Sequence, residues 1–172
     1  MTLSEYQEKA YSTAIYKDKI IYPVLGLANE FLSEYISKII NHKPEEEIVD
    51  ELMDAMWYVS AIATDLGFKL EYLFFSEDNI NMFTEEEQFK AFCFSLGTIC
   101  GKVKKWMRDY DKKEMPKDYL KVIKSSLIFI IQYLSTELKK YKYTLEDALQ
   151  MNIDKLQSRK ERGVIKGDGD NR

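Results

Sequence analysis

The chain has 172 residues, 45% of them hydrophobic and 31% charged, with a net charge of −4. This length and apolar content allow one sizeable core and exclude a disordered chain, and the acidic balance argues against a general nucleic-acid binder. No apolar run approaches the roughly 18 residues that a membrane-spanning helix needs, and the single histidine, His42, excludes a site built from several histidines.

The expected elements are all helical, because the chain has only seven glycines and three prolines and its apolar residues recur with helical spacing. The pattern predicts helices over 3–18, from Pro23 to about Asn41, from Pro44 to Gly67, and over about 70–75, 85–109, 117–141 and 145–160, with Thr84 and Thr144 as N-caps. The third is the clearest, because one continuous apolar stripe runs along it. We therefore expect a single all-α domain over 1–160.

Two cysteines, Cys93 and Cys100, lie seven residues apart on one of these helices. Their Cα atoms would be about 10 Å apart, which is too far for a disulfide. The N-terminal residues also lack the apolar core of a signal peptide. We therefore expect reduced core thiols and a cytoplasmic protein.

Self-comparison indicates two helical-hairpin repeats, over about 20–75 and 90–150. Leu25-Gly26 returns as Leu96-Gly97, and residues 57–74 align with 132–149. The alternative is a chance similarity between two amphipathic helix pairs. In the first repeat the polar positions hold Glu30, Glu34, Glu51 and Asp54, and the second repeat has Gly101, Lys105, Ser126 and Phe129 there. If the repeat is real, the second copy is degenerate and acid chemistry belongs to the first.

These four carboxylates fall where two antiparallel helices would meet, since Glu30 and Glu34 are four residues apart and Glu51 and Asp54 three. Gathered at one seam, they would repel one another unless a divalent cation bound there. Mg²⁺ takes oxygen ligands and completes its shell with water and substrate phosphates, and Mn²⁺ is a substitute. The spacing thus favours phosphoryl chemistry on a nucleotide, with a solvated helix face as the alternative.

Three segments resemble the MazG-like (dimeric-dUTPase-like) superfamily of all-α nucleoside triphosphate pyrophosphohydrolases. They read YPVLGLANEFLSEYISKI, EIVDELMDAMWYVSAIATDLGFKLEYL and LEDALQMNIDKLQSRKERGVIKGDGDNR, and they cover about 22–75 and 144–172. The ending is similar to small phage and bacterial members. The resemblance implies Mg²⁺-dependent hydrolysis of a nucleoside or deoxynucleoside triphosphate to the monophosphate and pyrophosphate, in the cytoplasm of a bacterium or a phage-infected host.

By position, the resemblance assigns metal binding and catalysis to Glu30, Glu51 and Asp54, assisted by Glu34. It assigns binding of the substrate nucleotide to Lys38, Trp57, Asn152, Lys155 and Arg159. For Trp57 the alternative is a packing role. The tail over 161–172 would act as a lid on the bound nucleotide. The expected ligand is a small nucleotide rather than a nucleic acid or a membrane. For the oligomeric state, both a monomer and a homodimer are compatible with the sequence.

One departure from the family pattern bears on catalysis. The second glutamate of the family's EXXE pair falls at Ser33, and Glu34 follows one place later. A non-catalytic protein that sequesters a nucleotide is therefore the alternative function. A plain interaction bundle, whose carboxylates only solvate a helix face, is the third.

Overall fold

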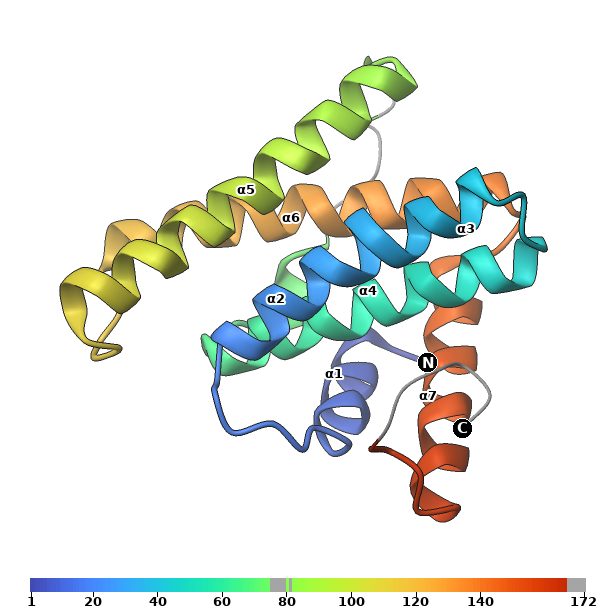
Figure 1. The fold of residues 1–172 in the computed structure, drawn as a ribbon, viewed down its shortest axis with the longest axis horizontal. Helices are drawn as coiled ribbons and strands as arrows, with labels where there is room; N and C mark the ends of the chain where they lie inside the picture. The colour runs from blue at the N-terminus through green and yellow to red at the C-terminus, as the bar shows by residue number, and fades with distance from the viewer. Residues whose placement is uncertain (75–79, 81, 167–172) are drawn as a thin grey trace.

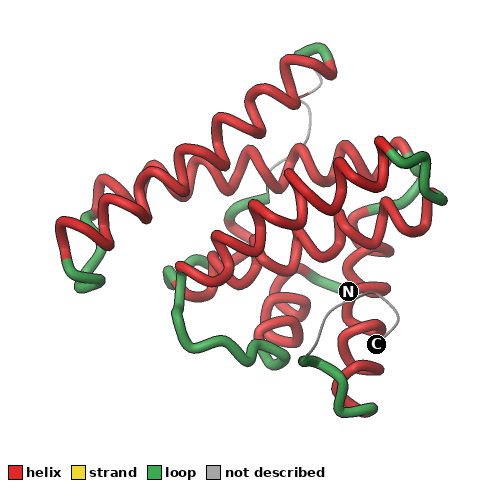
Figure 2. Tube along the Cα trace, viewed as in Figure 1, coloured by secondary structure: helices red, strands yellow, loops and turns green. Residues whose placement is uncertain are grey.

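The computed structural model describes residues 1–74, 80 and 82–166, and these form an all-helical bundle without strands (Figures 1 and 2). The elements are α1 (Leu3–Tyr11), α2 (Ile21–Asn29), the π-helix η1 (Glu30–Tyr35), α3 (Ile36–Ile40), α4 (Glu45–Asp65), the 3-10 turn η2 (Leu70–Tyr72), α5 (Glu85–Tyr110), α6 (Lys117–Lys140) and α7 (Leu145–Glu161). The all-α prediction is confirmed. In the described ranges, no helix has both the length and the apolar character to cross a membrane.

Helix α4 is the centre of the bundle and packs against α1, α2, η1, α6 and α7. Its apolar stripe, which includes Leu52, Val59 and Ile62, is fully buried. Helix α2 packs especially close to α4. The evidence is Gly26 on α2, where an added Cβ atom would overlap the ring of Tyr58 on α4. Glycine at this position therefore sets the short distance between α2 and α4, which carry the candidate site residues.

Helices α5 and α6 form a second hairpin, whose joined end extends away from α1 and α7, while the other end of α6 leads into α7 and contacts it (Figure 1). An aromatic cluster joins it to the first hairpin: the rings of Phe31 and Phe92 are 3.8 Å apart between centroids, and those of Phe92 and Tyr133 are 4.9 Å apart. The two hairpins coincide with the segments that the sequence comparison aligned. Their origin as a repeat stays a prediction.

Several predicted boundaries are confirmed. Thr84 caps α5 with a full capping box, and the side chain of Thr144 accepts a hydrogen bond at the start of α7. Helix α4 starts after Pro44, and Gly67 follows its end with a positive φ of 74°. Cys93 and Cys100 are free and half-buried. The polar connection over 76–83 lies largely outside the described residues.

For the first predicted helix, over 3–18, the predicted C-terminal end is wrong. Helix α1 stops at Tyr11, and residues 12–20 form a loop. The Thr13 hydroxyl donates to the carbonyl of Ala10 and closes the turn. Ile15, which supplied an apolar position in the helical pattern, is 54% exposed. Tertiary hydrogen bonds hold this loop against α4, and the local pattern does not encode them.

The second predicted helix has the expected extent but not the expected geometry. It continues from α2 through η1 into α3, and the six residues of η1 make π-helical hydrogen bonds. A π stretch takes in one extra residue relative to an α-helix and occurs often at functional sites. It lies here on the glutamate-bearing part of the helix.

Candidate metal and nucleotide site

The π-helix changes which side chains face α4. Ser33, where the family resemblance expects a glutamate, is exposed, whereas Glu34 is half-buried and lies close enough to Glu30 for the two carboxylates to repel. Because a π turn contains one more residue than an α turn, a glutamate displaced by one place can return to the packed side of the helix. The geometry of η1 thus keeps Glu34, rather than Ser33, on the packed side of the helix.

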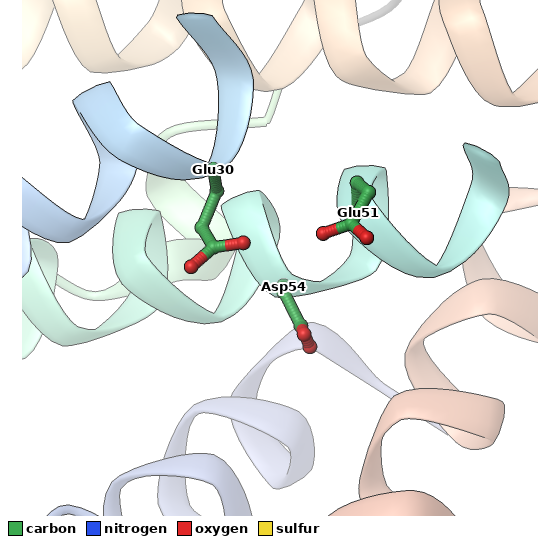
Figure 3. A group of neighbouring side chains, drawn as sticks. All are labelled: Glu30, Glu51 and Asp54. Carbon is green, nitrogen blue, oxygen red and sulfur yellow. The ribbon is translucent and has the colours of Figure 1, made fainter. Parts of the chain in front are cut away.

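Among the described residues, three carboxylates come together as a candidate metal site. Glu30 on η1 and Glu51 and Asp54 on α4 each offer an oxygen, and these oxygens lie within 4.8 Å of one another. In Figure 3 the Glu30 side chain points from η1 toward α4, whereas the Asp54 side chain points from α4 toward α1 and α7. Glu51 is buried, with 5% of its side chain exposed. We call this group the carboxylate cluster; Glu34 lies beside it.

The electrostatics of the cluster are those of crowded acids. Burial and the neighbouring carboxylates of Asp54 and Glu51 raise the pKa of Glu30 to about 8. Burial also raises the pKa of Asp54, although the nearby Lys155 ammonium opposes this. Acids with raised pKa values in one spot are a common mark of a functional site.

Two lysines flank the cluster, one from α7 and one from α3. The Lys155 ammonium on α7 lies 2.6 Å from Asp54 and 2.9 Å from Asp50, and these two carboxylates raise its pKa although burial opposes them. The Lys38 ammonium on α3 lies 3.4 Å from Glu51 Oε1 and 3.2 Å from Glu47 Oε2. Positive charge is therefore held at the edge of the cluster, where it could also meet a phosphate.

Asn152 orients Asp54 from α7. It is fully buried, and its Nδ2 donates to Asp54 Oδ1 at 3.1 Å. Its own Oδ1 accepts a hydrogen bond of 2.9 Å from the hydroxyl of Tyr6 on α1. Both ends of the amide are thus used, so that α1 and α7 jointly fix the position of one carboxylate on α4.

A cavity of about 130 Å³ opens beside the cluster. Its polar side is formed by Glu30, Asp54 and Arg159. Its other side, which we call the aromatic wall, consists of Tyr16, Tyr22, Trp57 and Tyr58. Ile165 also lines the cavity, so the described part of the C-terminal tail reaches the site. The rest of the expected lid, 167–172, lies outside the described residues.

Asp65 at the end of α4 fixes the loop that carries part of the aromatic wall. Its carboxylate accepts hydrogen bonds from the hydroxyls of Tyr11 and Tyr16, at 2.8 and 3.1 Å, and from the Ile20 amide at 2.7 Å. Ile20 has φ 67° and ψ −49° at the centre of a γ-turn closed by a 2.7 Å bond from Ile21 N to Lys19 O. Such a conformation is strained by about 1–3 kcal/mol for a β-branched residue, and Asp65 helps to hold it.

The structure brings the nine predicted site residues to one region between η1, α3, α4 and α7. Glu30, Glu51 and Asp54 form the cluster, Lys38, Asn152 and Lys155 contact its members or their neighbours, and Trp57 and Arg159 line the adjacent cavity. Trp57 also has the packing role given as its alternative, since its Nε1 donates to Ala10 O and Thr13 Oγ1.

Sequence reasoning did not assign six further residues to the site, namely Tyr6, Tyr16, Tyr22, Asp50, Tyr58 and Asp65. Asp50 was the easiest to find, because it precedes Asp54 by one helical turn. The tyrosines gave no signal, since nothing in the spacing of α1 or the 12–20 loop indicates which part of α4 they reach.

The donor set fits a hard divalent cation. All three groups of the cluster offer carboxylate oxygens, the ligand type that Mg²⁺ and Mn²⁺ prefer. Mg²⁺ usually keeps several of its own waters, so carboxylates at this spacing can hold it partly through water.

The comparisons with known proteins identify a similar phage protein but no activity. The chain is 40% identical over 78 residues to the Gene 37 protein of Mycobacterium phage L5. The match covers 44% of this chain and 66% of that protein, which is just under two thirds of the relative's length. No family model matches the chain, and no solved structure matches it significantly. The chain is thus similar to a phage protein whose printed name states no activity.

Proposed function

We propose that the protein is a Mg²⁺-dependent nucleoside triphosphate pyrophosphohydrolase, which converts a nucleoside or deoxynucleoside triphosphate to the monophosphate and pyrophosphate. The observation that carries the proposal is the carboxylate cluster, of which Glu30 and Asp54 line a cavity together with Arg159 and the aromatic wall. Acidic ligands, a positive charge and flat apolar rings are the features that a metal, a phosphate chain and a base require.

In this proposal Glu30, Glu51 and Asp54 would hold Mg²⁺, which would supply Lewis-acid polarisation of phosphate oxygens. Asn152 and Lys155 keep Asp54 oriented before substrate binds. Arg159 and Lys155 neutralise the charge that builds up on the phosphates and on the leaving pyrophosphate.

The removal of a proton from the attacking water is a second task, and it needs a carboxylate that the metal does not occupy. A general base works best when its pKa is near the operating pH. In the metal-free protein, burial and the charges of Asp54 and Glu51 bring the pKa of Glu30 to about 8. A bound Mg²⁺ would lower that pKa, so that Glu30 would act as a metal ligand and not as the base. Glu34, beside the cluster, is the candidate for positioning the attacking water.

The test is to incubate the protein with each of the eight common NTPs and dNTPs and Mg²⁺, and to separate NMP, NDP, phosphate and pyrophosphate by chromatography. We expect NMP and pyrophosphate from at least one of them. Glu51→Gln should remove the activity. Glu46→Gln, on the exposed first turn of the same helix, is the matched control and should keep it.

The products separate the alternatives. NDP and phosphate would replace the proposed cleavage position by one between the β- and γ-phosphates. Nucleotide that is retained stoichiometrically and returned unchanged would favour the sequestering protein. The phage relative fits a role in an infected host cell, where either activity would act on the nucleotide pool.

A further inference from the structure

The charge of the chain is distributed unevenly, and one end of the second hairpin is basic. Residues 102–124 hold nine lysines and arginines against four acidic residues, which leaves 16 basic and 25 acidic residues for the rest of the chain. This segment, which we call the basic end, therefore has a net charge of +5, and the rest has −9. It includes the joined end of α5 and α6, which extends away from α1 and α7 (Figure 1). The acidic balance of the whole chain conceals this region.

The acids of the first hairpin are too far away to cancel this charge. Phe92 on α5 and Tyr133 on α6 pack on Phe31 of the first hairpin. Lys102 and Lys117 follow ten and sixteen residues further out along the same two helices. At 1.5 Å per residue these separations are about 15 and 24 Å. The Debye length at physiological ionic strength is about 8 Å, so exposed charges this far apart are largely screened from each other.

The lysines of the basic end are not used for ion pairs. Within the ranges that the structure describes, none of its eight lysines pairs with a carboxylate, whereas lysines elsewhere, such as Lys90 and Lys155, do. All of the eight are exposed except Lys102, which is half-buried and lies over the ring of Tyr119 at 4.5 Å. These charges are therefore available to an anionic partner.

A groove between α5 and α6 adds a different chemistry beside these lysines. The side chain of Phe94 on its α5 side is 75% exposed, so the ring is open to a ligand. Thr98 on α5 and Ser125 on α6 bring hydroxyl groups, and Lys121 brings a positive charge. The lining contains one acid, Asp118. An open ring, hydroxyl groups and a cation thus lie together on one face of the hairpin.

The spacing of these residues forms two rows. On α5, Phe94, Thr98 and Lys102 follow one another at four residues and share one side of the helix. On α6, Lys117, Lys121 and Lys124 follow at four and three residues. Positive charge along a groove with an exposed aromatic ring suits a chain of phosphates that carries flat bases.

We infer that the basic end binds single-stranded nucleic acid, with phosphates along the lysines of α6 and a base stacked on Phe94. A single strand is required because its bases are free to stack on a side chain, whereas the bases of a duplex are stacked on one another. The inference goes beyond the proposed function and does not depend on it, since the carboxylate cluster belongs to the first hairpin. An acidic protein surface, including that of a second copy, is the alternative that the experiment must exclude.

The experiment measures the binding of fluorescein-labelled oligo(dT) and oligo(rU), about twenty nucleotides long, by fluorescence anisotropy without Mg²⁺ between about 50 and 200 mM NaCl. The variant Lys117→Gln/Lys121→Gln/Lys124→Gln should lower the affinity at the lowest salt by at least about tenfold. It should also reduce the slope of log affinity against log salt by about 2, because each lost phosphate contact removes about 0.7.

The matched control removes three exposed lysines outside the basic end, with Lys9→Gln/Lys17→Gln/Lys142→Gln. It should change neither the affinity nor the slope. Phe94→Ala tests the stacking separately. It should lower the affinity by about five- to a hundredfold and leave the salt slope unchanged, because stacking releases no counterions. Since Phe94 is exposed, the far-UV circular dichroism should not change.

Several results would overturn the inference. They are the absence of binding, equal losses in the two triple variants, a duplex bound as tightly as the single strands, and displacement of oligo(dT) by an equal concentration of poly-L-glutamate. Light scattering of the protein without oligonucleotide tests the second copy: a dimer that the Lys117, Lys121 and Lys124 changes dissociate, and that oligo(dT) does not, would also overturn it. Nucleotide hydrolysis by this triple variant should be unchanged, so the hydrolase proposal stands or fails separately.

Discussion

In the first hairpin, the π-helical stretch places Glu30 across from Glu51 and Asp54. In the second hairpin, α5 and α6 run as uninterrupted α-helices of 26 and 24 residues, and the aligned positions hold Gly101, Ser126 and Phe129 among others. Both pairs are long helices packed side by side (Figure 1). Only the first combines acids, an irregular turn and a close helix approach.

The difference lies as much in the neighbours as in the hairpins. Helices α1 and α7 both pack on α4 and bring Tyr6, Asn152 and Lys155 to Asp54. In the second hairpin, α6 also contacts α7, but the end that joins α5 to α6 extends away from both α1 and α7 (Figure 1). Four buried or half-buried carboxylates are tolerated in the first hairpin because other helices supply donors and positive charge.

The largest effect should come from Asp54→Asn, which we expect to lower turnover by at least about a hundredfold. Asparagine keeps an oxygen for Lys155 and Asn152 and removes a buried negative charge, so the far-UV circular dichroism should not change. Asp118→Asn, on the exposed first turn of α6, is the control in the second hairpin. If the Asp54→Asn protein is active, Asp54 is not part of the catalytic site.

The second largest effect should be that of pH on the affinity for Mg²⁺. Burial and the carboxylates of Asp54 and Glu51 raise the pKa of Glu30 from 4.5 to about 8. Below pH 8 the folded protein therefore holds a proton that Mg²⁺ must displace, and the affinity should fall by about tenfold per pH unit between 8 and 6. Titration calorimetry at pH 6, 7 and 8 measures this slope, which Glu30→Gln should flatten.

The raised pKa of Glu30 also predicts how the stability of the metal-free protein changes with pH. Because the folded state binds this proton more tightly than the unfolded chain, the free energy of unfolding of the metal-free protein should fall as pH rises from about 4.5 to 8. A wild-type Mg²⁺ affinity that is constant from pH 6 to 8 would contradict the raised pKa of Glu30.

The two aligned glycines give a sharper contrast in stability. Gly26→Ala should destabilise the protein by about 1–3 kcal/mol, because the new Cβ would overlap the Tyr58 ring. Gly97→Ala should instead stabilise it by up to about 1 kcal/mol, since the site is exposed and open and alanine is the better helix former. Urea unfolding of both variants tests the pair, and equal effects would contradict the close approach of α2 to α4.

The smallest effect should come from Glu34→Gln, with a loss in kcat/KM of less than about tenfold, because Glu34 lies beside the carboxylate cluster and not in it. The aligned residue of the second hairpin, Lys105, is exposed, and Lys105→Gln should have no effect. A loss equal to that of Glu51→Gln would instead make Glu34 a direct ligand.

The sequence was sufficient for the all-α fold, for most helix positions and for three of the four grouped carboxylates, since these follow from local spacing. The stripe of α4 marks its buried face, and residues three or four apart on a helix share a side. The family resemblance added Asn152 and Lys155, which lie about a hundred positions from Asp54. Their approach to Asp54 depends on how α7 packs, which no local pattern specifies.

The π-helix and the 12–20 loop could not be predicted for a related reason. One extra residue shifts a pattern of period 3.6 by about 100°. The six residues of η1 are too few to reveal that shift in the sequence, so η1 looked like ordinary helix. The loop looked helical because Ile15 and Tyr16 continue the spacing of α1. Its real conformation is fixed by Asp65, whose hydrogen bonds span 45 to 54 residues of sequence.

The bond from Tyr6 to Asn152 joins residues 146 positions apart, and that from Asn152 to Asp54 spans 98. Pairings of such high contact order form late in folding, because a long stretch of chain must close before they contribute. During synthesis from the N-terminus, α1 and α4 leave the ribosome well before α7. The growing chain therefore carries the carboxylates of α4 without the groups that orient and balance them, and the site becomes complete only when α7 docks.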